Sequence, residues 1–493
     1  MERLDAAAVR AWAHASRSAL AGSRDRIDAV NVFPVPDSDT GTNVLLTVTG
    51  GVAALEHLPV ADQDARDVAR QFARGAMRSA RGNSGVIVSQ YLTGFAQTLP
   101  EQADAFDVAR CLGAAARAAR GAMQDPQEGT ILTLADSVAR SATTAADAGA
   151  DLATMLASVV ADAHRALAGI SAEHPVLRAA HVLDAGACAL LVVLDALARV
   201  VGGGTVAGDA LAWLPATPTD PWPVEPAGGA FEVMLLVGSA DADLDAALQV
   251  AMAALGDSVA VVGGDGMWHV HVHTDHPASA IAAATIGRRE QVLVRLVAGA
   301  HASSAHVDDG RCGVVVCTSS PELASWYAST GAVTLVRCPE APISRDHLER
   351  AVTDTGAVRV AVLPGDSVAD DELTALVASH PDAEVLDAGD ELRVAVAALA
   401  LAAAADAGPA HEALRRLRSV ELADPVTPSS VRAAADELLR TASGPVESLT
   451  VLLRDAGPTL DDLAGYLAEH HEGVEPIVVG PTGRGPAVLI GLD

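Results

Sequence analysis

The chain has 493 residues, half of them hydrophobic and only 3% aromatic, so its cores must be built mainly from Ala, Val and Leu. This length is too great for a single hydrophobic core and is sufficient for about three domains. The formal net charge of −30 argues against binding to nucleic acid or to anionic membrane surfaces, because both present negative phosphate groups.

The chain contains 33 arginines and no lysine. The absence of lysine excludes a Walker-A phosphate loop, a protein-kinase strand lysine, a Schiff base and a lysine general base, because each of these needs a lysine amine. A protein of this composition that handles ATP must neutralise the phosphate charge with metal ions, arginine, hydroxyl groups and backbone N–H groups.

The first part of the chain shows helical periodicity nearly throughout, up to about Val201, where Gly202-Gly203-Gly204 stops the pattern. We therefore predict an all-helical domain over residues 1–203. Residues 204–228 contain too many prolines for a helix and are predicted to form a semi-rigid linker.

The turn Asn31–Asn43 in the helical region carries two carboxylates, Asp37 and Asp39, just before a helix predicted to begin near Thr42. Carboxylates that alternate along an extended turn can converge on one hard cation, and N–H groups at the following helix start can face phosphate oxygens. The turn could therefore bind both the metal and the phosphates of Mg-ATP. The alternative is an ordinary turn in which Asp caps the next helix.

Three further turns place small residues at predicted helix starts, in Ala80–Gln90, Glu128–Thr133 and Val182–Gly186. The first of them sets Asn83-Ser84 between two glycines, which lets backbone approach a ligand closely. Each turn alone is generic. Four such turns in one helical domain favour a phosphate or nucleotide site more than any one of them.

After the linker, the pattern predicts a small α/β middle domain over residues 229–305. Its predicted elements are strands at Phe231–Val237, Ser258–Val262 and Trp268–His273 and a helix at Asp243–Leu255. On the last strand, His269, His271 and His273 alternate and so share a face, which is a workable arrangement for zinc, with His276 nearby. The alternative is a polar strand face at a dimer contact.

The third region, residues 306–493, is predicted to be an α/β domain. Its strands Gly313–Cys317, Ala332–Val336 and Val358–Leu363 alternate with helices, which favours parallel pairing. The later predicted elements are helices at Glu391–Ala407 and Ser429–Thr441 and strands near Ser448–Arg454, Pro476–Val479 and Ala487–Gly491.

Five cysteines without dense spacing, charged residues at the start of the chain and the lack of a signal-peptide pattern predict a reducing, cytoplasmic location. The longest apolar runs, Ala185–Leu194 and Val394–Ala405, are too short to span a bilayer. We expect neither integral membrane association nor nucleic acid among the partners.

In order and spacing, the four turns of the first domain resemble the nucleotide-binding domain of the dihydroxyacetone kinase L-subunit type, in the version found in fatty acid kinase A proteins. Gly256-Asp-Ser258 followed by Val270–Thr274 resembles the middle domain of those kinases, and the last region resembles their DegV-like end in outline. The resemblance implies a multidomain protein. It predicts an all-α antiparallel eight-helix barrel at the N-terminus, a small α/β middle domain and a C-terminal α/β DegV-like domain.

The resemblance also implies a site for ATP and two Mg²⁺ ions at one end of the barrel. The implied metal ligands are Asp37 and Asp39, with Asn31 as a third. The residues implied to contact phosphate or to border the nucleotide are Thr40, Gly41, Thr42, Asn43, Asn83, Ser84, Gly85, Gly129, Thr130, Asp184, Ala185 and Gly186. Relatives usually have Gly where this chain has Ser38. Arg81 is a further candidate phosphate contact, with a surface helix charge as its alternative.

The implied reaction transfers the γ-phosphoryl group of ATP to the carboxylate of a fatty acid presented by a separate carrier protein of the DegV type, giving an acyl phosphate. A carboxylate is already ionised at neutral pH and needs no general base. The alternatives are phosphorylation of a small hydroxylated ketone and a non-catalytic nucleotide-sensing scaffold.

The resemblance bears on the other two domains as well. It implies a homodimer, a middle domain that serves dimerisation or binds zinc, and a C-terminal domain on which the carrier docks. Relatives pair the histidines matching His271 and His273 with a cysteine on the first strand of the middle domain. This chain has Ala230 at that position.

Overall fold

The computed structural model describes residues 2–34, 38–56, 58, 63–204, 211, 214, 229–240, 243–264, 266–297, 310–442, 446, 448–455, 461–471 and 473–492. The chain divides into two compact units. The first comprises Met1–Gly228, Asp243–Val272 and Ala298–Ala305, and the second comprises Gly229–Ala242, His273–Val297 and His306–Asp493. The segment predicted as a middle domain is thus divided between the two units, and most of the predicted linker lies outside the described residues.

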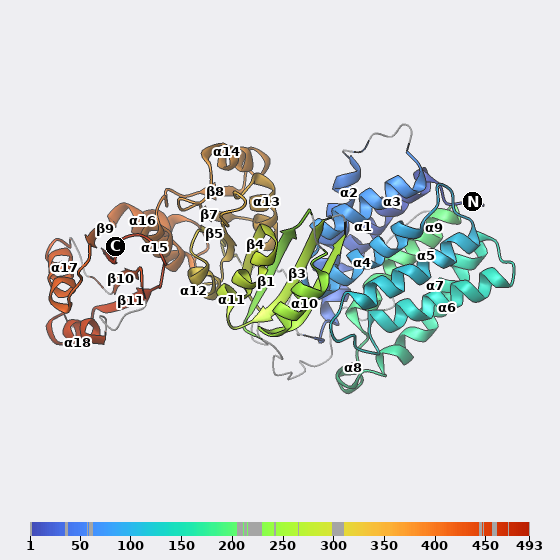
Figure 1. Ribbon diagram of the computed structural model, residues 1–493, viewed down its shortest axis with the longest axis horizontal. Coiled ribbons are helices and arrows are strands. Elements are labelled where there is room, and N and C mark those ends of the chain that lie inside the picture. Colours follow the sequence, from blue (N-terminus) through green and yellow to red (C-terminus); the bar gives the residue numbers. More distant parts are fainter. Residues whose placement is uncertain are drawn as a thin grey trace. The chain divides into compact units, whose positions relative to one another are not determined.

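Helices form most of the first unit (Figure 1). They are α1 (Ala6–Ala29), α2 (Thr40–Glu56), α3 (Ala65–Arg78), α4 (Gly82–Thr98), α5 (Ala105–Gly121), α6 (Ile131–Asp147), α7 (Leu152–Ser171), α8 (Pro175–Ala180) and α9 (Ala185–Val201). The last helix ends at Val201, and Gly202 is its C-cap. The prediction of a helical first region that ends at this glycine run is therefore confirmed.

The long helices pack in chain order. Each helix from α1 to α7 contacts the next, and α9 contacts both α7 and α1, so the series closes on itself. Further contacts of α1 with α3 and of α2 with α4 fill the interior with side chains. At the centre of this core, Trp12 packs edge-on against Phe95, with ring centroids 5.2 Å apart, and donates its indole N–H to the Val193 carbonyl. Phe72 and Tyr91 are also buried in this core, and most of its other side chains are aliphatic.

The first unit also contains helix α10 (Asp245–Ala253), strand β2 (Asp257–Gly264) and most of strand β3 (Met267–Thr274), which pairs with β2. Strand β2 packs against α4. Its residues Ala260 and Val262 join Met77, Ala80 and Val86 in a small apolar cluster. The strand is therefore held to the helices by burial of apolar surface.

The second unit contains a sheet in which the strands follow the order β1-β4-β6-β5-β7-β8. These are β1 (Phe231–Gly238), β4 (Arg288–Leu296), β5 (Gly313–Thr318), β6 (Val333–Val336), β7 (Val360–Leu363) and β8 (Ala383–Val385). Strands β5 to β8 are parallel, as the alternation of strands and helices predicted. Sequence reasoning missed β4, which pairs antiparallel with β1 and β6.

Helices connect these strands. They are α11 (Pro277–Ala283), the short 3-10 turns η1 (Ala284–Ile286) and η2 (Pro321–Leu323), α12 (Ala324–Ser329), α13 (Arg345–Asp354) and α14 (Asp370–Ser379). The chain then runs through α15 (Glu391–Leu401) and α16 (Gly408–Arg416). The prediction of one helix over Glu391–Ala407 was therefore wrong in length. Pro409 stands in the first turn of α16, where it starts a new helix but could not continue an old one.

A second sheet completes this unit, with the strand order β11-β10-β12-β9. Its elements are β9 (Arg418–Leu422), α17 (Pro428–Arg440), β10 (Ser448–Leu453), α18 (Asp461–His470), β11 (Glu475–Val479) and β12 (Val488–Leu492). Helix α15 contacts β5 and β7 of the first sheet and β10 and β12 of the second. The region predicted as one α/β domain is thus two sheets joined by one shared helix.

Within the described ranges, none of the helices combines the length and the apolar character needed to cross a bilayer. All five cysteines are reduced and buried.

Candidate functional site

A cavity of about 270 Å³ lies in the first unit, where the four turns singled out from the sequence meet. Its lining residues are Phe33 and Pro34 from the first turn, Asn83, Ser84 and Ile87 at the start of α4, Met123, Asp125, Gln127, Thr130, Ile131 and Leu132 around the start of α6, Asp184 and Gly186 at the start of α9, and Ser258 on β2. The structure therefore brings together residues that are up to 225 positions apart in the chain, from Phe33 to Ser258.

Helix N-termini surround this cavity, because α4, α6 and α9 begin with residues that line it. Their exposed N–H groups and macrodipoles favour negative charge. Two of these helix starts are capped by their own side chains. Thr130 accepts from the Leu132 N–H at 3.3 Å, and Asp184 accepts from the Ala187 N–H at 2.7 Å. Helix α4 differs, because its N-cap residue Arg81 makes no side-chain capping bond.

The start of α4 has the local geometry of a ligand cradle. Gly82 has φ +55°, and a Cβ atom there would lie 2.6 Å from Nδ2 of Asn43, so this position requires glycine. Asn83 places a buried amide oxygen here that has no hydrogen-bond partner in the described part of the chain. A buried polar atom of this kind is costly unless a ligand or water satisfies it. Ser84 reaches across to α2, with its Oγ 3.2 Å from Oγ1 of Thr40.

Helix α2 is capped from a distance by Asp28, which lies in the last turns of α1. The N–H groups of Gly41 and Thr42 donate to Oδ1 of Asp28 at 2.6 and 3.2 Å, and the Thr42 hydroxyl donates to Oδ2 at 2.8 Å. Burial raises the pKa of Asp28 to about 6, although the bonds from Thr42 oppose that shift. Gly41 and Thr42 therefore shape the loop rather than line the cavity.

Sequence reasoning missed Asp28. A weak signal was available, because a carboxylate near the C-terminus of a helix is electrostatically unfavourable and needs another reason to be there. The capping contact explains its presence.

The implied metal ligands lie in the loop between α1 and α2. Asp37 lies outside the described residues. Asn31 is buried, and Asp39 directly precedes α2, where its carbonyl accepts from the Asn43 N–H at 2.8 Å. Ser38 has φ +55°, a backbone conformation that glycine adopts at no cost. This conformation would suit the glycine that the resemblance implies at the position of Ser38.

An asparagine amide and aspartate carboxylates are hard oxygen ligands of the kind that Mg²⁺ prefers. The donor types in this loop therefore fit a magnesium ion.

The third turn is fixed by an ion pair as well as by its cap. Arg120 bonds both Glu128 and Asp136, at 2.8 and 2.6 Å. The hydrogen bonds from Arg120 and Thr133 hold the pKa of Glu128 below its usual range. Gly129 has φ +81° and donates its N–H to Oγ1 of Thr133 at 2.9 Å. These contacts connect the turn to α5 and α6.

The fourth turn holds a fully buried carboxylate. Burial raises the pKa of Asp184 to about 6, while the bond from the Ala187 N–H opposes the shift. Its own N–H donates to Oγ of Ser171 at 3.0 Å. Ala185 and Gly186 follow as the first residues of α9, and both are buried.

Arg81 lies at the N-cap of α4 and its side chain is buried, with only 6% of the residue exposed. The interpretation of Arg81 as a surface helix charge is therefore wrong. Its guanidinium donates to the Ser79 carbonyl at 2.6 Å, and its backbone N–H donates to Thr47. Arg81 does not line the cavity, and neither does Gly85, whose backbone packs against Thr47.

The histidines His269, His271 and His273 are all buried on β3. In the second unit, Glu232 of β1 presents a ligand atom within 4.8 Å of one on His273, and Arg295 of β4 donates to the same carboxylate. Sequence reasoning considered only Ala230 on this strand and missed Glu232. Zinc at His271 and His273 stays a prediction, which elemental analysis of the purified protein tests.

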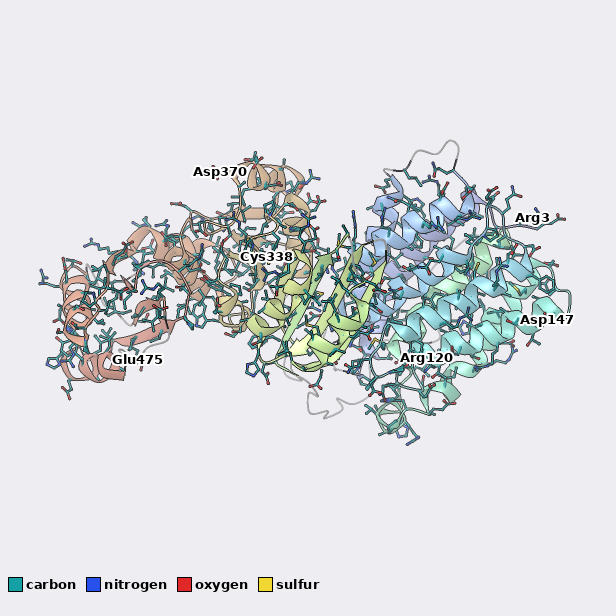
Figure 2. The ribbon with its side chains drawn as sticks, in the orientation of Figure 1. Arg3, Arg120, Asp147, Cys338, Asp370 and Glu475 are labelled. Atoms are coloured by element: carbon teal, nitrogen blue, oxygen red, sulfur yellow. The ribbon has the colours of Figure 1, made fainter. Side chains whose placement is uncertain are left out.

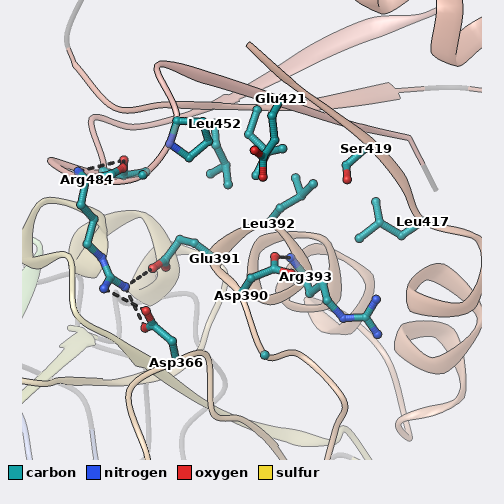
Figure 3. A pocket seen from close by; sticks show the side chains of 15 residues that line it. Asp366, Asp390, Glu391, Leu392, Arg393, Leu417, Ser419, Glu421, Leu452 and Arg484 are labelled. Atoms are coloured by element: carbon teal, nitrogen blue, oxygen red, sulfur yellow. Dashed lines mark hydrogen bonds and ion pairs between the residues drawn. The ribbon is translucent and has the colours of Figure 1, made fainter. Parts of the chain in front are cut away.

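A second cavity, of about 410 Å³, lies in the second unit between the start of α15 and strands of the second sheet (Figure 3). Arg484 is its central cation, and it bonds Asp366 through two hydrogen bonds of 2.9 and 3.0 Å and Glu391 at 3.3 Å. Glu391 also accepts from the hydroxyls of Tyr327 and Thr318. Burial raises the pKa of Glu391 above its usual value.

Helix starts with and without side-chain caps meet around this small cavity, and helix N-termini favour negatively charged groups such as phosphates. Comparison with known proteins identifies the domains. The sequence model of the DAK2 domain matches residues 34–199, and that of the fatty acid kinase A-like middle domain matches residues 229–301.

Relatives share much of the chain. It is 26% identical over 399 residues to Protein YloV of Bacillus subtilis, covering 75% of this chain and 70% of YloV. It is 25% identical over 397 residues to an uncharacterized protein of Staphylococcus aureus, with coverage of 75% and 70%. An uncharacterized protein of Staphylococcus haemolyticus is 31% identical over 274 residues, which are 52% of this chain and 49% of that relative.

Both domain models match in the expected order, and together with the similarity to YloV they support an assignment to the fatty acid kinase A family. Its domains are those of an ATP-using kinase. With the exception of Phe33 and Ser258, every residue that lines the first cavity falls within the DAK2 match.

Proposed function

We propose that this protein is an ATP-dependent kinase subunit that phosphorylates the carboxylate of a fatty acid held by a separate carrier protein of the DegV type. The product is an acyl phosphate. The observation that carries the proposal is the start of α4, where Asn83 and Ser84 line the cavity at a helix N-terminus that no side chain of its N-cap residue caps.

The phosphates of ATP fit this helix start for two reasons. The first N–H groups of a helix have no partner within the helix and suit phosphate oxygens. The nearby side chains of Asn83 and Ser84 add neutral donors without bringing a permanent cation. Because the chain has no lysine, these groups and the metal must bind the phosphates and neutralise their charge.

Magnesium would be held by Asn31, Asp37 and Asp39 in the loop before α2. When bound, two such ions supply neutralisation of the charge that develops on the transferring phosphoryl group. Asp28 supports the loop by capping α2, and its contacts with Gly41 and Thr42 fix where that helix begins.

The reaction requires no proton transfer. An oxygen of the fatty acid carboxylate forms a bond to the γ-phosphorus, the bond from that phosphorus to the β,γ-bridging oxygen breaks, and ADP leaves with the electron pair. Since the carboxylate is ionised at neutral pH, no general base is needed. The residues of this site therefore bind, orient and neutralise, which is most of what phosphoryl transfer asks of a protein.

Turnover of ATP in the presence of a fatty-acid-loaded carrier tests the proposal. ADP release that depends on the loaded carrier, with an acyl product trapped by hydroxylamine, is the expected result, and the same carrier without fatty acid is the control. Turnover with dihydroxyacetone and no carrier would instead favour a small-molecule kinase. Tight Mg-ATP binding without turnover by any carrier would favour a nucleotide sensor.

A further inference from the structure

Ser258 lines the candidate nucleotide cavity although it lies outside the DAK2 match of residues 34–199. It belongs to the segment matched by the middle domain, residues 229–301. The other polar side chains of the lining come from the helical part of the chain. They are Asn83, Ser84, Asp125, Gln127, Thr130 and Asp184.

Strand β2 is docked so that one of its faces meets the helices. Ala260 and Val262 are buried in the apolar cluster with residues of α3 and α4, and the backbone of Ala260 bridges that of Met123. Ser258 lies two residues before Ala260 on this strand and lines the cavity. The apolar contacts therefore hold the strand against the helices, and Ser258 lies in the cavity lining.

The backbone at Ser258 adopts a conformation that serine rarely takes. Its φ is +52°, and among the described residues only Ser38 and His181 share a positive φ without being glycine. A residue other than glycine in this region costs about 1 to 2 kcal/mol. Glycine would form the same turn at lower cost but would provide no hydroxyl. Strain of this kind gathers at ligand sites, where the surrounding structure maintains it.

We propose that the Ser258 hydroxyl donates a hydrogen bond to an oxygen of the nucleotide bound in this cavity, so that the middle domain supplies part of the ATP site. The inference rests on the proposed function, because it assigns the cavity to ATP. A neutral hydroxyl suits this position, since the lining already holds the carboxylates Asp125 and Asp184. ATP would then tie β2 to the start of α4.

Two substitutions distinguish the effect of losing the hydroxyl group from the effect of the strained backbone at Ser258. Ser258→Gly removes the hydroxyl and relieves the backbone strain, whereas Ser258→Ala removes the hydroxyl and keeps the strain. Both variants should bind Mg-ATP about tenfold more weakly, the usual effect of losing one hydrogen bond to a charged group. The melting temperature of Ser258→Gly without ligand should be equal to or above that of the unaltered protein.

His181→Gly is the matched control, because His181 is exposed, has φ +56° and lies outside the cavity lining. It should relieve strain in the same way and leave the dissociation constant for Mg-ATP unchanged, as measured by calorimetric titration. Wild-type affinity in Ser258→Gly would overturn the inference and leave the proposed function intact. If the unaltered protein and His181→Gly bind no Mg-ATP, the proposed function fails instead.

Discussion

The cavity lined by Asn83 and Ser84 and the cavity lined by Arg484 both lie where helix starts and carboxylates meet, but they differ in what their hydrogen-bond donors do. In the second unit, the guanidinium of Arg484 is already bonded to Asp366 and Glu391. In the first unit, no arginine is among the described residues that line the cavity, and the N-cap residue of α4 makes no side-chain cap. The first cavity therefore offers helix N–H groups, and no arginine of its described lining, to a negatively charged ligand, whereas the cation of the second cavity is already paired.

Removal of a metal ligand should have the largest effect. Asp39→Ala should lower the affinity for Mg-ATP by about a hundredfold or more, because a lost charged contact costs several kcal/mol, while the helical fold is kept. Calorimetric titration and circular dichroism check both parts. Asp147→Ala is the control, since Asp147 is an exposed carboxylate at the end of α6 (Figure 2). Retained Mg-ATP affinity in Asp39→Ala would disprove the metal assignment.

A pH series tests the buried cap of the first cavity. The pKa of Asp184 is raised from 3.8 to about 6 by burial, so the folded state binds the proton more tightly than the unfolded state. Stability therefore falls as pH rises from about 4 through 6, by up to roughly 3 kcal/mol. Asp184→Asn lacks this titration. The unfolding free energy of the variant, measured in urea, should therefore rise relative to that of the unaltered protein as pH increases over the same range.

Asp151 provides a comparison of opposite sign. It caps α7, and the hydrogen bonds from Thr154 hold its pKa below the usual value. Its stabilising contribution is present at neutral pH and is lost as pH falls through the lowered pKa. Asp151→Asn should therefore lose stability relative to the unaltered protein as pH rises. Parallel slopes for Asp151→Asn and Asp184→Asn would show that their electrostatic environments do not differ as described.

The arginine of the second cavity should matter for stability and not for ATP. Arg484→Met leaves Glu391 with one partner fewer and should destabilise the second unit by about 1 to 2 kcal/mol, a modest value because the arginine side chain is 39% exposed. Hydrogen exchange of peptides from β5 and α15 measures the effect. Arg393→Met is the matched control, since Arg393 lines the same cavity but pairs with Asp387, whose side chain is 94% exposed. A change in Mg-ATP affinity for Arg484→Met would contradict the comparison.

The smallest effect should come from the glycine at the start of α4. Gly82→Ala places a Cβ atom 2.6 Å from the Asn43 amide in a backbone conformation unfavourable for alanine. We expect a loss of about 1 kcal/mol in stability and a severalfold weaker binding of Mg-ATP. Gly121→Ala, at the exposed end of α5 with no atom within 4 Å of the added Cβ, should be neutral or stabilising. Equal behaviour of the two variants would remove the evidence for a cradle at Gly82.

Much of the first unit could be predicted because its signals are local. Gly202 ends α9, Thr130 and Asp184 cap the helices that they precede, and glycine takes the left-handed conformation at Gly82 and Gly129. The parallel strands β5 to β8 followed from alternation with helices. By contrast, nothing local marks β4, whose pairing with β1 joins residues far apart in the chain. Charged and apolar residues alternate there too weakly to distinguish a strand.

By itself, the sequence determined which turns could hold a phosphate and which lysine-dependent mechanisms are excluded. These properties belong to short segments, where backbone preference and side-chain type act over a few residues. The tertiary structure decided that the turns meet in one cavity, that Asp28 caps α2 from another helix and that Ser258 joins them from β2. Those contacts depend on how helices and strands pack, because packing sets distances between residues that the chain order leaves unrelated.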